Sequence, residues 1–308
     1  MQDVHVLNLG AGVQSSWLYL AFMGIIKAPF ELPKLDVAIW SDTGDEPGAE
    51  ARELGLPDTP GSVYAHLDWL RSLNGPPILT GQKGVISKDL ARDENSTGQR
   101  FASIPAFTQD QKGKIGKVKR QCTREYKLEV IGKVLRRDFL GLPKGRSPKG
   151  IIVHRYIGLS FDEGGRVARQ RKIKNPKYLI THFPLWENMI TRAQCRIDLA
   201  AVVPHRVPRS ACVQCPFHDD EEWQRIKAEP LDWQRAVRAD ESLRVPGNIV
   251  NRNMDAKMYL HRSCQPLVQI DFAALKAEKE RDMGEREKIL AAQGNLNFAE
   301  ECLGMCGV

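Results

Sequence analysis

The chain has 308 residues, which is enough for one large domain or for a main domain with a smaller partner. Apolar residues make up 42% of the chain and charged residues 27%, a composition typical of a folded globular protein that excludes a disordered chain. No apolar run approaches the roughly 18–20 residues that a membrane span requires, and the N-terminus shows neither a basic segment nor a cleavage site. We therefore expect a cytoplasmic protein without a membrane partner.

Short apolar runs alternate with helical patterns through the first part of the chain. Strands are predicted at residues 4–9 and 35–40, helical segments at 17–23 and 62–73, and a short strand near 77–80. Strands that alternate with helices are typical of a doubly wound, mostly parallel sheet. The sequence therefore predicts an α/β fold.

Residues 81–120 interrupt this alternation. They are rich in glycine, lysine and polar residues and show little periodicity, which favours a long functional loop. The later elements are predicted as a helix at 123–140, strands at 151–159 and 178–183, and helices at 191–202, 219–228, 231–239 and 272–292. The pattern predicts two parts, an α/β domain at residues 1–189 and a mainly helical region at 190–308.

A glycine-containing turn follows the first predicted strand. Gly10, Ala11 and Gly12 allow backbone N–H groups to approach a phosphate closely, and the helix that follows adds its positive N-terminal end. Ser15 and Ser16 supply hydroxyl groups as further donors. The turn therefore predicts a phosphate-binding loop.

Two common phosphate-binding loops fit this turn poorly. A Walker A loop ends in Gly-Lys-Ser/Thr, and no lysine is present here. A dinucleotide-binding Rossmann loop has a third glycine where Ser15 stands, and an acid about 20 residues further on. The acid at the next strand end is Asp42, which lies thirty residues after Gly12.

The segment Gly10-Ala11-Gly12-Val13-Gln14-Ser15 resembles the PP-loop of the ATP pyrophosphatase superfamily, whose pattern is S-G-G-x-D-S. Gly10 replaces the first serine and Gln14 replaces the aspartate. Four further segments are similar, in the same order, to the branch related to phosphoadenosine phosphosulfate (PAPS) reductase. They are Ser41-Asp42-Thr43-Gly44, the segment from Arg120 to Lys127, the segment from Ile157 to Glu163 with Arg166, and Cys212-Val213-Gln214-Cys215-Pro216-Phe217.

The resemblance implies that residues 1–189 form a PP-loop domain that binds ATP, or a sulfonucleotide such as PAPS or its 3′-dephospho form (APS) as substrate. Arginine suits the phosphates because it forms bidentate contacts with them, and Asp42 can hold a ribose hydroxyl or Mg²⁺. Lys127 is a catalytic candidate that positions phosphate. The nucleotide-binding candidates are Gly10, Ala11, Gly12, Gln14, Ser15, Ser16, Asp42, Thr43, Gly44, Arg120, Arg124, Gly158 and Arg166.

The cysteines point to a metal. Cys212 and Cys215 have C-x-x-C spacing, and with Cys122 as a distant third ligand they can hold a 4Fe–4S cluster or a zinc ion. Family members that carry a cluster have a Cys-Cys pair where this chain has Gln121-Cys122. Cys195 is the first replacement for the missing ligand and Cys264 the second. An iron without a fourth protein ligand can bind sulfide for transfer.

Cys302 and Cys306 lie near the C-terminus. Glu301-Cys302 is similar to the Glu-Cys-Gly of sulfonucleotide reductases, but Leu303 precedes Gly304. Either cysteine is a candidate nucleophile that forms a thiosulfonate or persulfide, which the other resolves. Both are therefore catalytic candidates, and one of them can instead complete the cluster.

Basic residues gather in the middle of the chain. Residues 112–149 contain thirteen Lys or Arg and only three acids, a local field that suits a polyanion such as nucleic acid.

Three functions follow from these features. The first is ATP-dependent, adenylating sulfur transfer or modification of a nucleic-acid or related acceptor, with a partner protein as sulfur donor or reductant. The second is a sulfonucleotide reductase that releases sulfite through a tail cysteine. The third is a nucleotide- and cluster-binding subunit of a nucleic-acid modification or defence complex without turnover. The basic stretch and the altered Cys-Cys site favour the first.

Overall fold

The computed structural model describes residues 2–92, 104–118, 120–245 and 256–292. The chain divides into two compact units, and each is built from two separate segments. Met1–Ser103 and Arg120–Cys212 form the first unit, and Ile104–Lys119 and Val213–Val308 form the second. None of the helices within the described ranges is long and apolar enough to cross a membrane.

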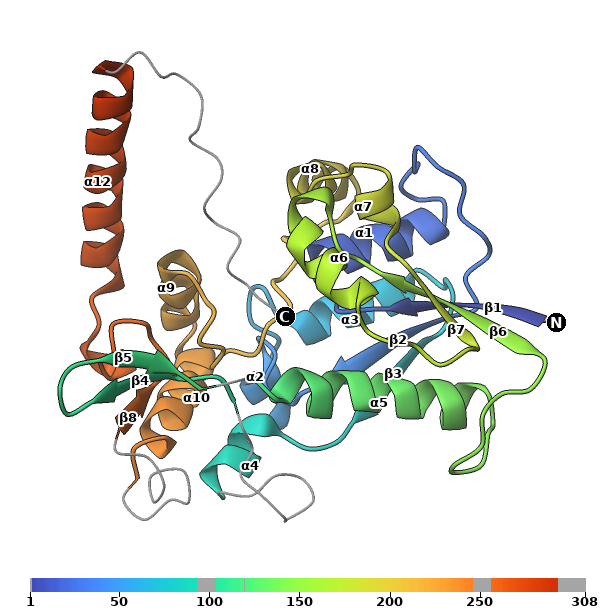
Figure 1. Cartoon of the computed structure of the whole chain (residues 1–308), viewed down its shortest axis with the longest axis horizontal. Coiled ribbons are helices and arrows are strands. Elements are labelled where there is room, and N and C mark those ends of the chain that lie inside the picture. The colour runs from blue at the N-terminus through green and yellow to red at the C-terminus, as the bar shows by residue number, and fades with distance from the viewer. Residues whose placement is uncertain (1, 93–103, 119, 246–255, 293–308) are drawn as a thin grey trace. The chain divides into compact units, whose positions relative to one another are not determined.

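The first unit contains a five-stranded sheet in the order β3-β2-β1-β6-β7 (Figure 1). All four neighbouring pairs run parallel. The strands are β1 (Gln2–Asn8), β2 (Val37–Asp42), β3 (Ile78–Gln82), β6 (Ile151–Ile157) and β7 (Leu179–His182). The predicted α/β class with a parallel sheet is confirmed.

The strand order reverses at β1. The chain passes from β1 to β2 and β3 on one side, and later to β6 and β7 on the other side. In open parallel sheets, ligands bind outside the carboxyl ends of the strands at such a reversal point, because the adjacent loops diverge there. A binding site is therefore expected at the loops that follow β1, β2 and β6.

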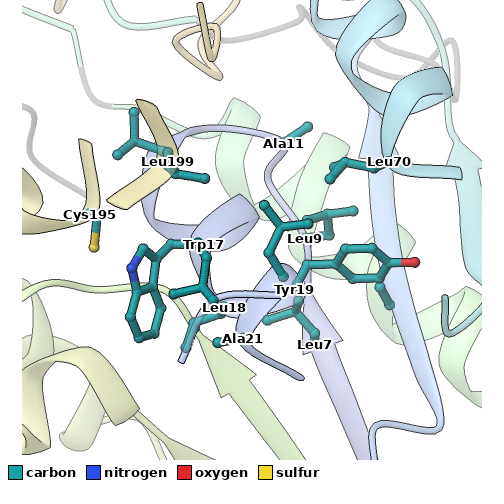
Figure 2. Close-up of a cluster of buried hydrophobic side chains, with 14 of the residues drawn as sticks. Leu7, Leu9, Ala11, Trp17, Leu18, Tyr19, Ala21, Leu70, Cys195 and Leu199 are labelled. Atoms are coloured by element: carbon teal, nitrogen blue, oxygen red, sulfur yellow. The ribbon is translucent and has the colours of Figure 1, made fainter. Parts of the chain in front are cut away.

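Helices cover both faces of this sheet. α1 (Val13–Phe22), α3 (Val63–Ser72) and α8 (Arg192–Val202) pack on one face, and Figure 2 shows Trp17, Leu18, Leu70 and Leu199 around Leu7 and Leu9. A continuous helical stretch covers the other face. It comprises η1 (Thr123–Leu128), α5 (Glu129–Lys133) and η2 (Val134–Phe139), with π-helical turns in η1 and η2.

The shorter elements of the first unit connect these layers. α2 (Ala49–Glu53) and α4 (Ile86–Ala91) follow β2 and β3. After β6 come η3 (Phe161–Glu163) and α6 (Gly164–Arg171), and after β7 comes α7 (Pro184–Glu187).

The first unit extends beyond the expected boundary between residues 189 and 190. Trp17 of α1 is 1% exposed, and its indole N–H donates a hydrogen bond of 2.7 Å to Asp198 of α8. Cys195 and Leu199 of α8 also lie in the α1 core (Figure 2). Because α8 covers the apolar side of α1, residues 190–212 belong to the first unit.

The second unit has a three-stranded antiparallel sheet in the order β5-β4-β8. Its strands are β4 (Phe107–Asp110), β5 (Ile115–Lys117) and β8 (Ala256–Tyr259). Its helices are α9 (Asp220–Ala228), α10 (Pro230–Ser242), η4 (Leu267–Gln269) and α12 (Phe272–Ala292). β4, β5 and α4 lie within the expected loop at 81–120, so part of that segment is regular structure.

Candidate functional site

The loop after β1 folds back on itself around one oxygen atom. The hydroxyl group of Ser15 accepts hydrogen bonds from the N–H of Gly10 at 3.1 Å and the N–H of Gly12 at 3.3 Å. It donates in turn to the carbonyl oxygen of Gly12 at 3.2 Å. Two backbone N–H groups that converge on one oxygen form the kind of concavity that binds phosphate oxygens.

The conformation of this loop depends on small residues. Ala11 has a φ of +56° and is fully buried, a left-handed conformation that costs an L-residue about 1–2 kcal/mol. Gly12 precedes α1, and a Cβ atom there would lie 3.2 Å from the Cβ of Ser210. The loop therefore has little room for larger side chains. The approach of Ser210 was not predicted, because nothing in the sequence pattern links it to the loop.

The loop after β6 packs directly against the loop after β1. A Cβ atom on Gly158 would lie 2.9 Å from the backbone nitrogen of Ser15. Because the atom in the way belongs to the backbone, a side-chain rotation could not remove this clash. The side-chain amide of Gln14 donates to Ser160 at 3.2 Å and to Glu163 at 2.9 Å. Glu163 also pairs with Arg166. Gln14, Gly158 and Arg166 are therefore brought to one place, whereas their contact with a nucleotide stays a prediction.

The loop after β2 carries a buried polar network. One carboxylate oxygen of Asp42 accepts hydrogen bonds from the Gly44 N–H at 2.7 Å and from the Tyr64 hydroxyl at 2.8 Å. Burial raises the pKa of Asp42, and the two hydrogen bonds oppose that effect. Burial and the neighbouring Asp42 carboxylate raise the pKa of Tyr64, so this phenol stays a donor.

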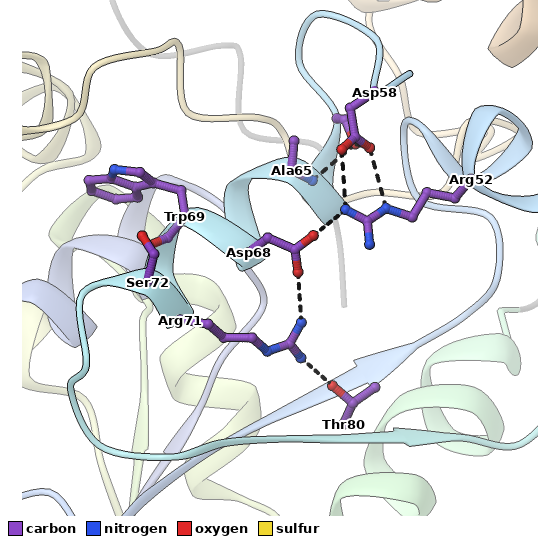
Figure 3. Close-up of polar contacts among 9 residues, drawn as sticks. Arg52, Asp58, Ala65, Asp68, Trp69, Arg71, Ser72 and Thr80 are labelled. Carbon is purple, nitrogen blue, oxygen red and sulfur yellow. Dashed lines mark hydrogen bonds and ion pairs between the residues drawn. The ribbon is translucent and has the colours of Figure 1, made fainter. Parts of the chain in front are cut away.

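Tyr64 is held in turn by Arg52. The guanidinium of Arg52 lies 5.5 Å from the centre of the Tyr64 ring and pairs with Asp58 and Asp68. Figure 3 shows Arg52 between these two carboxylates and continues the network through Asp68 and Arg71 to Thr80 of β3. These contacts fix α2, α3 and β3 around the end of β2.

Glu46 and Lys127 form an ion pair beside Asp42. Glu46 is fully buried, and its Oε1 accepts a hydrogen bond of 2.9 Å from Lys127. Its Oε2 is also buried and has no hydrogen-bond partner among the described residues. Burial lowers the pKa of Lys127, but the charge and hydrogen bond of Glu46 and the nearby Cys212 together raise it by more, so the pKa is raised and Lys127 stays charged. Sequence reasoning passed over Glu46, although it lies four residues after Asp42 in the same polar turn.

Cys212 faces the same buried network. Its sulfur lies 3.2 Å from the hydroxyl of Thr43, which is itself fully buried. Burial and then the Glu46 carboxylate raise the pKa of Cys212 well above its ordinary value, so the side chain is a neutral thiol. The structure thus brings Asp42, Thr43, Lys127 and Cys212 together.

The other metal candidates lie in different surroundings. Cys122 is half-buried just before η1, and Cys215 belongs to the second unit. Cys195 is fully buried in the α1 core, where burial and then Asp198 raise its pKa to about 12. In the described ranges, no three His, Cys, Asp or Glu side chains are grouped so that they could hold a metal ion. The metal centre stays a prediction.

The remaining predicted residues differ in exposure. Arg120 is half-buried, whereas the Arg124 side chain is 83% exposed and lies 3.5 Å from Glu129. Cys302 and Cys306 fall outside the described residues. Because the Arg124 side chain points outward from η1, Arg124 is the weakest of the nucleotide-binding candidates.

A buried hydrogen-bond chain that the sequence did not predict joins α1 to the surface. Ser16 is fully buried, and its hydroxyl lies 2.8 Å from Nε2 of His66, whose Nδ1 lies 2.8 Å from Nε2 of His205. Burial lowers the pKa of His66 to about 3, so its ring is neutral. The hydroxyl of Ser16 therefore holds α3 against α1 and does not face a ligand. The available signal was His66 on the apolar face of its helix, between Val63 and Leu70.

No known family model matches this sequence, and no curated protein matches it.

Proposed function

We propose that the first unit binds an adenine nucleotide and uses it to adenylate a nucleic-acid or related acceptor, which is then modified with sulfur or another nucleophile. The observation that carries the proposal is the pair of N–H groups of Gly10 and Gly12, which converge on a single oxygen at the reversal point of a parallel sheet. The sequence resemblance to PP-loop proteins supplies the identity of the nucleotide.

The nucleotide is assigned to the three loops at the carboxyl edge of the sheet. In this arrangement the N-terminal end of α1, whose first turn holds no acid, faces the phosphates and favours their negative charge. A phosphate oxygen takes the place of the Ser15 hydroxyl between Gly10 and Gly12. Asp42 accepts a hydrogen bond from the ribose, and Lys127 neutralises charge that develops on the phosphates.

The proposed reaction has two balanced steps. A carbonyl oxygen of the acceptor attacks the α-phosphorus of ATP, the α–β phosphoanhydride bond breaks, and pyrophosphate leaves with its electron pair. A nucleophile, sulfide-level sulfur from a donor protein in the sulfur-transfer case, then attacks the activated carbon and releases AMP. Asp42, Lys127 and the loop after β1 bind and orient the nucleotide through both steps.

The test measures the products of ATP. Purified protein with pooled RNA or DNA and a sulfur donor is expected to convert ATP to AMP and pyrophosphate only when the acceptor is present. Asp42→Asn is expected to weaken nucleotide binding, whereas Asp138→Asn, at an exposed position of η2, is the matched control that leaves binding unchanged. ATP binding without acceptor-dependent pyrophosphate release would contradict the reaction but not the site.

One observation favours a second function, a nucleotide-binding subunit without turnover. Gln14 stands where PP-loops have aspartate, and its amide is used to tie the loop to Ser160 and Glu163. A side chain engaged in this way stabilises the loop and contributes no charge to the reaction. Tight ATP binding with no product under any acceptor condition would favour this function.

The predicted 4Fe–4S cluster has a separate test. Anaerobically purified protein is expected to show the broad absorption of visible light that is typical of thiolate-bound iron–sulfur clusters. It is also expected to contain iron and acid-labile sulfide. Colourless, zinc-loaded protein would favour the zinc alternative, and protein without either metal would contradict a metal centre.

A further inference from the structure

The exposed face of the β5-β4-β8 sheet carries lysine and apolar side chains in alternation. Side chains on a strand alternate between the two faces, so Phe107, Gln109, Ile115, Lys117, Lys257 and the buried Tyr259 share one face. Thr108 and Met258 point to the other face and are buried. Ile115 is 56% exposed, and Lys117 and Lys257 are exposed as well. This face of the second unit is thus basic and partly apolar.

The charge of the β4–β5 hairpin is available to a ligand. Residues 104–118 contain three lysines and a single acid, Asp110. The carboxylate of Asp110 accepts hydrogen bonds from the backbone N–H of Lys112 at 2.9 Å and of Lys114 at 2.8 Å, so it closes the turn. Within the described part of the chain, none of the three lysines forms an ion pair.

One of these lysines is fixed in position. The ammonium group of Lys117 lies 4.9 Å from the centre of the Phe107 ring and 4.9 Å from the centre of the Phe217 ring. Two aromatic contacts restrict a side chain that would otherwise sample many rotamers, so less entropy is lost when it binds an anion. Lys117 is therefore a preorganised anion contact beside the exposed side chain of Ile115.

We propose that this sheet face binds single-stranded nucleic acid. Lys117 and Lys257 on this face contact phosphates, together with Lys112 and Lys114 of the adjoining hairpin turn. Ile115 packs against an unpaired base, which only a single strand exposes. The proposal takes from the proposed function only the nature of the acceptor. It also divides the basic stretch at 112–149, because residues 112–118 belong to the sheet of the second unit and residues 120–149 to the first unit.

A second copy of the chain is a poorer occupant of this surface. β5 is an edge strand of only three residues, and its exposed sequence Ile115-Gly116-Lys117 lies beside Lys114. Short edge strands with lysine and glycine resist pairing with another strand. Charge complementarity therefore favours a polyanion.

The experiment measures fluorescence anisotropy of a labelled 12-nucleotide single strand with the full chain and no ATP. The triple variant Lys112→Gln/Lys114→Gln/Lys117→Gln is expected to weaken binding about 10-fold or more at 0.1 M salt and to lower the slope of log affinity against log salt by about 2, since each phosphate contact in a single strand contributes about 0.7. Lys27→Gln/Lys34→Gln/Lys279→Gln removes three exposed lysines elsewhere and is expected to change neither value.

Two further variants separate binding from folding. Lys117→Arg keeps the charge and the contacts with both rings, and is expected to bind like the wild type. Ile115→Ala is expected to weaken the single strand several-fold without changing the salt slope, and to leave the weaker binding of the matching duplex unaltered. If Ile115→Ala weakened the binding of the single strand and of the duplex equally, the proposed contact between Ile115 and an unpaired base would be wrong.

Other outcomes also decide the matter. The proposal is wrong if the control triple variant weakens binding as much as the hairpin variant, because the effect would then be net charge alone. It is also wrong if polyglutamate competes as well as the oligonucleotide at equal charge, or if the hairpin variant abolishes a dimer. Because these binding experiments contain no ATP, their outcome is independent of the test of ATP turnover.

Discussion

At the scale of single residues, the pair of Glu46 and Lys127 is asymmetric. The carboxylate is fully buried, whereas the Lys127 side chain is 26% exposed. Removing the lysine leaves a buried charge without compensation, and removing the charge of the glutamate does not. We therefore expect the two single variants to differ in stability.

Lys127→Met is expected to lower the free energy of unfolding by about 2 kcal/mol, reduced from the cost of breaking a wholly buried pair because Lys127 reaches solvent. Glu46→Gln is expected to cost less, and the double variant to recover part of the loss. Urea unfolding at pH 7 measures all three. Equal losses in the two single variants would show that the pair is not what stabilises this turn.

Gly158 is a second residue whose role follows from close contact. Gly158→Ala places a Cβ atom 2.9 Å from the Ser15 backbone, so it is expected to displace the phosphate-binding loop and weaken nucleotide binding about 10-fold, with a stability loss of about 1–3 kcal/mol. Gly132→Ala is the control, because a Cβ atom there would meet nothing within 4 Å beyond the backbone of its own helix, and alanine favours a helix. Calorimetric titration with ATP and thermal unfolding compare the two. If Gly158→Ala bound ATP as tightly as the wild type, the nucleotide site would not be at the loop after β1.

At the scale of elements, three neighbouring strands carry a row of histidines. His5 of β1 stacks on His154 of β6 at 4.9 Å between ring centres, and Nδ1 of His154 lies 2.9 Å from Nε2 of His182 in β7. The hydroxyl of Tyr156 lies 2.9 Å from His5. Asp3, Asp36 and Glu187 supply the nearby negative charge.

This row predicts a loss of stability at mildly acidic pH. Burial and then the neighbouring His154 lower the pKa of His5 and of His182 below the ordinary value of 6.5. The unfolded chain therefore binds protons at a higher pH than the folded chain does, so this contribution is complete above about pH 6.5 and is lost as the pH falls below it. His182→Phe keeps a ring beside Tyr156 and is expected to flatten the decline of the melting temperature between pH 7.5 and 5. His218→Phe, in the second unit, is the comparison, and a decline as steep in His182→Phe as in the wild type would contradict this account.

The sequence predicted long periodic elements well and short polar ones poorly. The strands that became β1, β2 and β6 were found because each is an apolar run that ends at a glycine or polar turn. β4 and β5 have four and three residues, and four of these seven residues are polar, so no periodicity could reveal them. Their pairing with β8 depends on contacts distant in sequence, which local patterns do not contain.

The candidate site was predicted to a similar extent. The three loops were found because each follows a predicted strand, and parallel strands bring such loops to one edge of the sheet. Glu46, Tyr64 and Ser210 were not found, since their contacts depend on packing between segments. Cys195 was proposed as the missing metal ligand because it lies on the helix that leads towards Cys212, and the structure places it in the apolar core of α1.

At the scale of the whole molecule, the two ligands proposed here bind different units. ATP is expected to slow amide hydrogen exchange at residues 9–16, 42–46 and 157–163 without slowing it at 107–117. A single-stranded oligonucleotide is expected to have the opposite effect. Hydrogen exchange followed by mass spectrometry measures both footprints, and protection of the hairpin by ATP alone would contradict separate sites.

The discontinuous second unit also has a consequence for synthesis on the ribosome. β4 is made early, but its partner β8 comes much later, since Phe107 pairs with Tyr259. At about 5–20 residues per second, the 152 residues from the one after Phe107 to Tyr259 take roughly 8–30 s to translate. Throughout that interval the lysine-rich hairpin has emerged without the strand that completes its sheet, while β1, β2 and β3 are already able to pair. The nascent chain is therefore expected to form part of its parallel sheet first and to complete its antiparallel one near the end of translation.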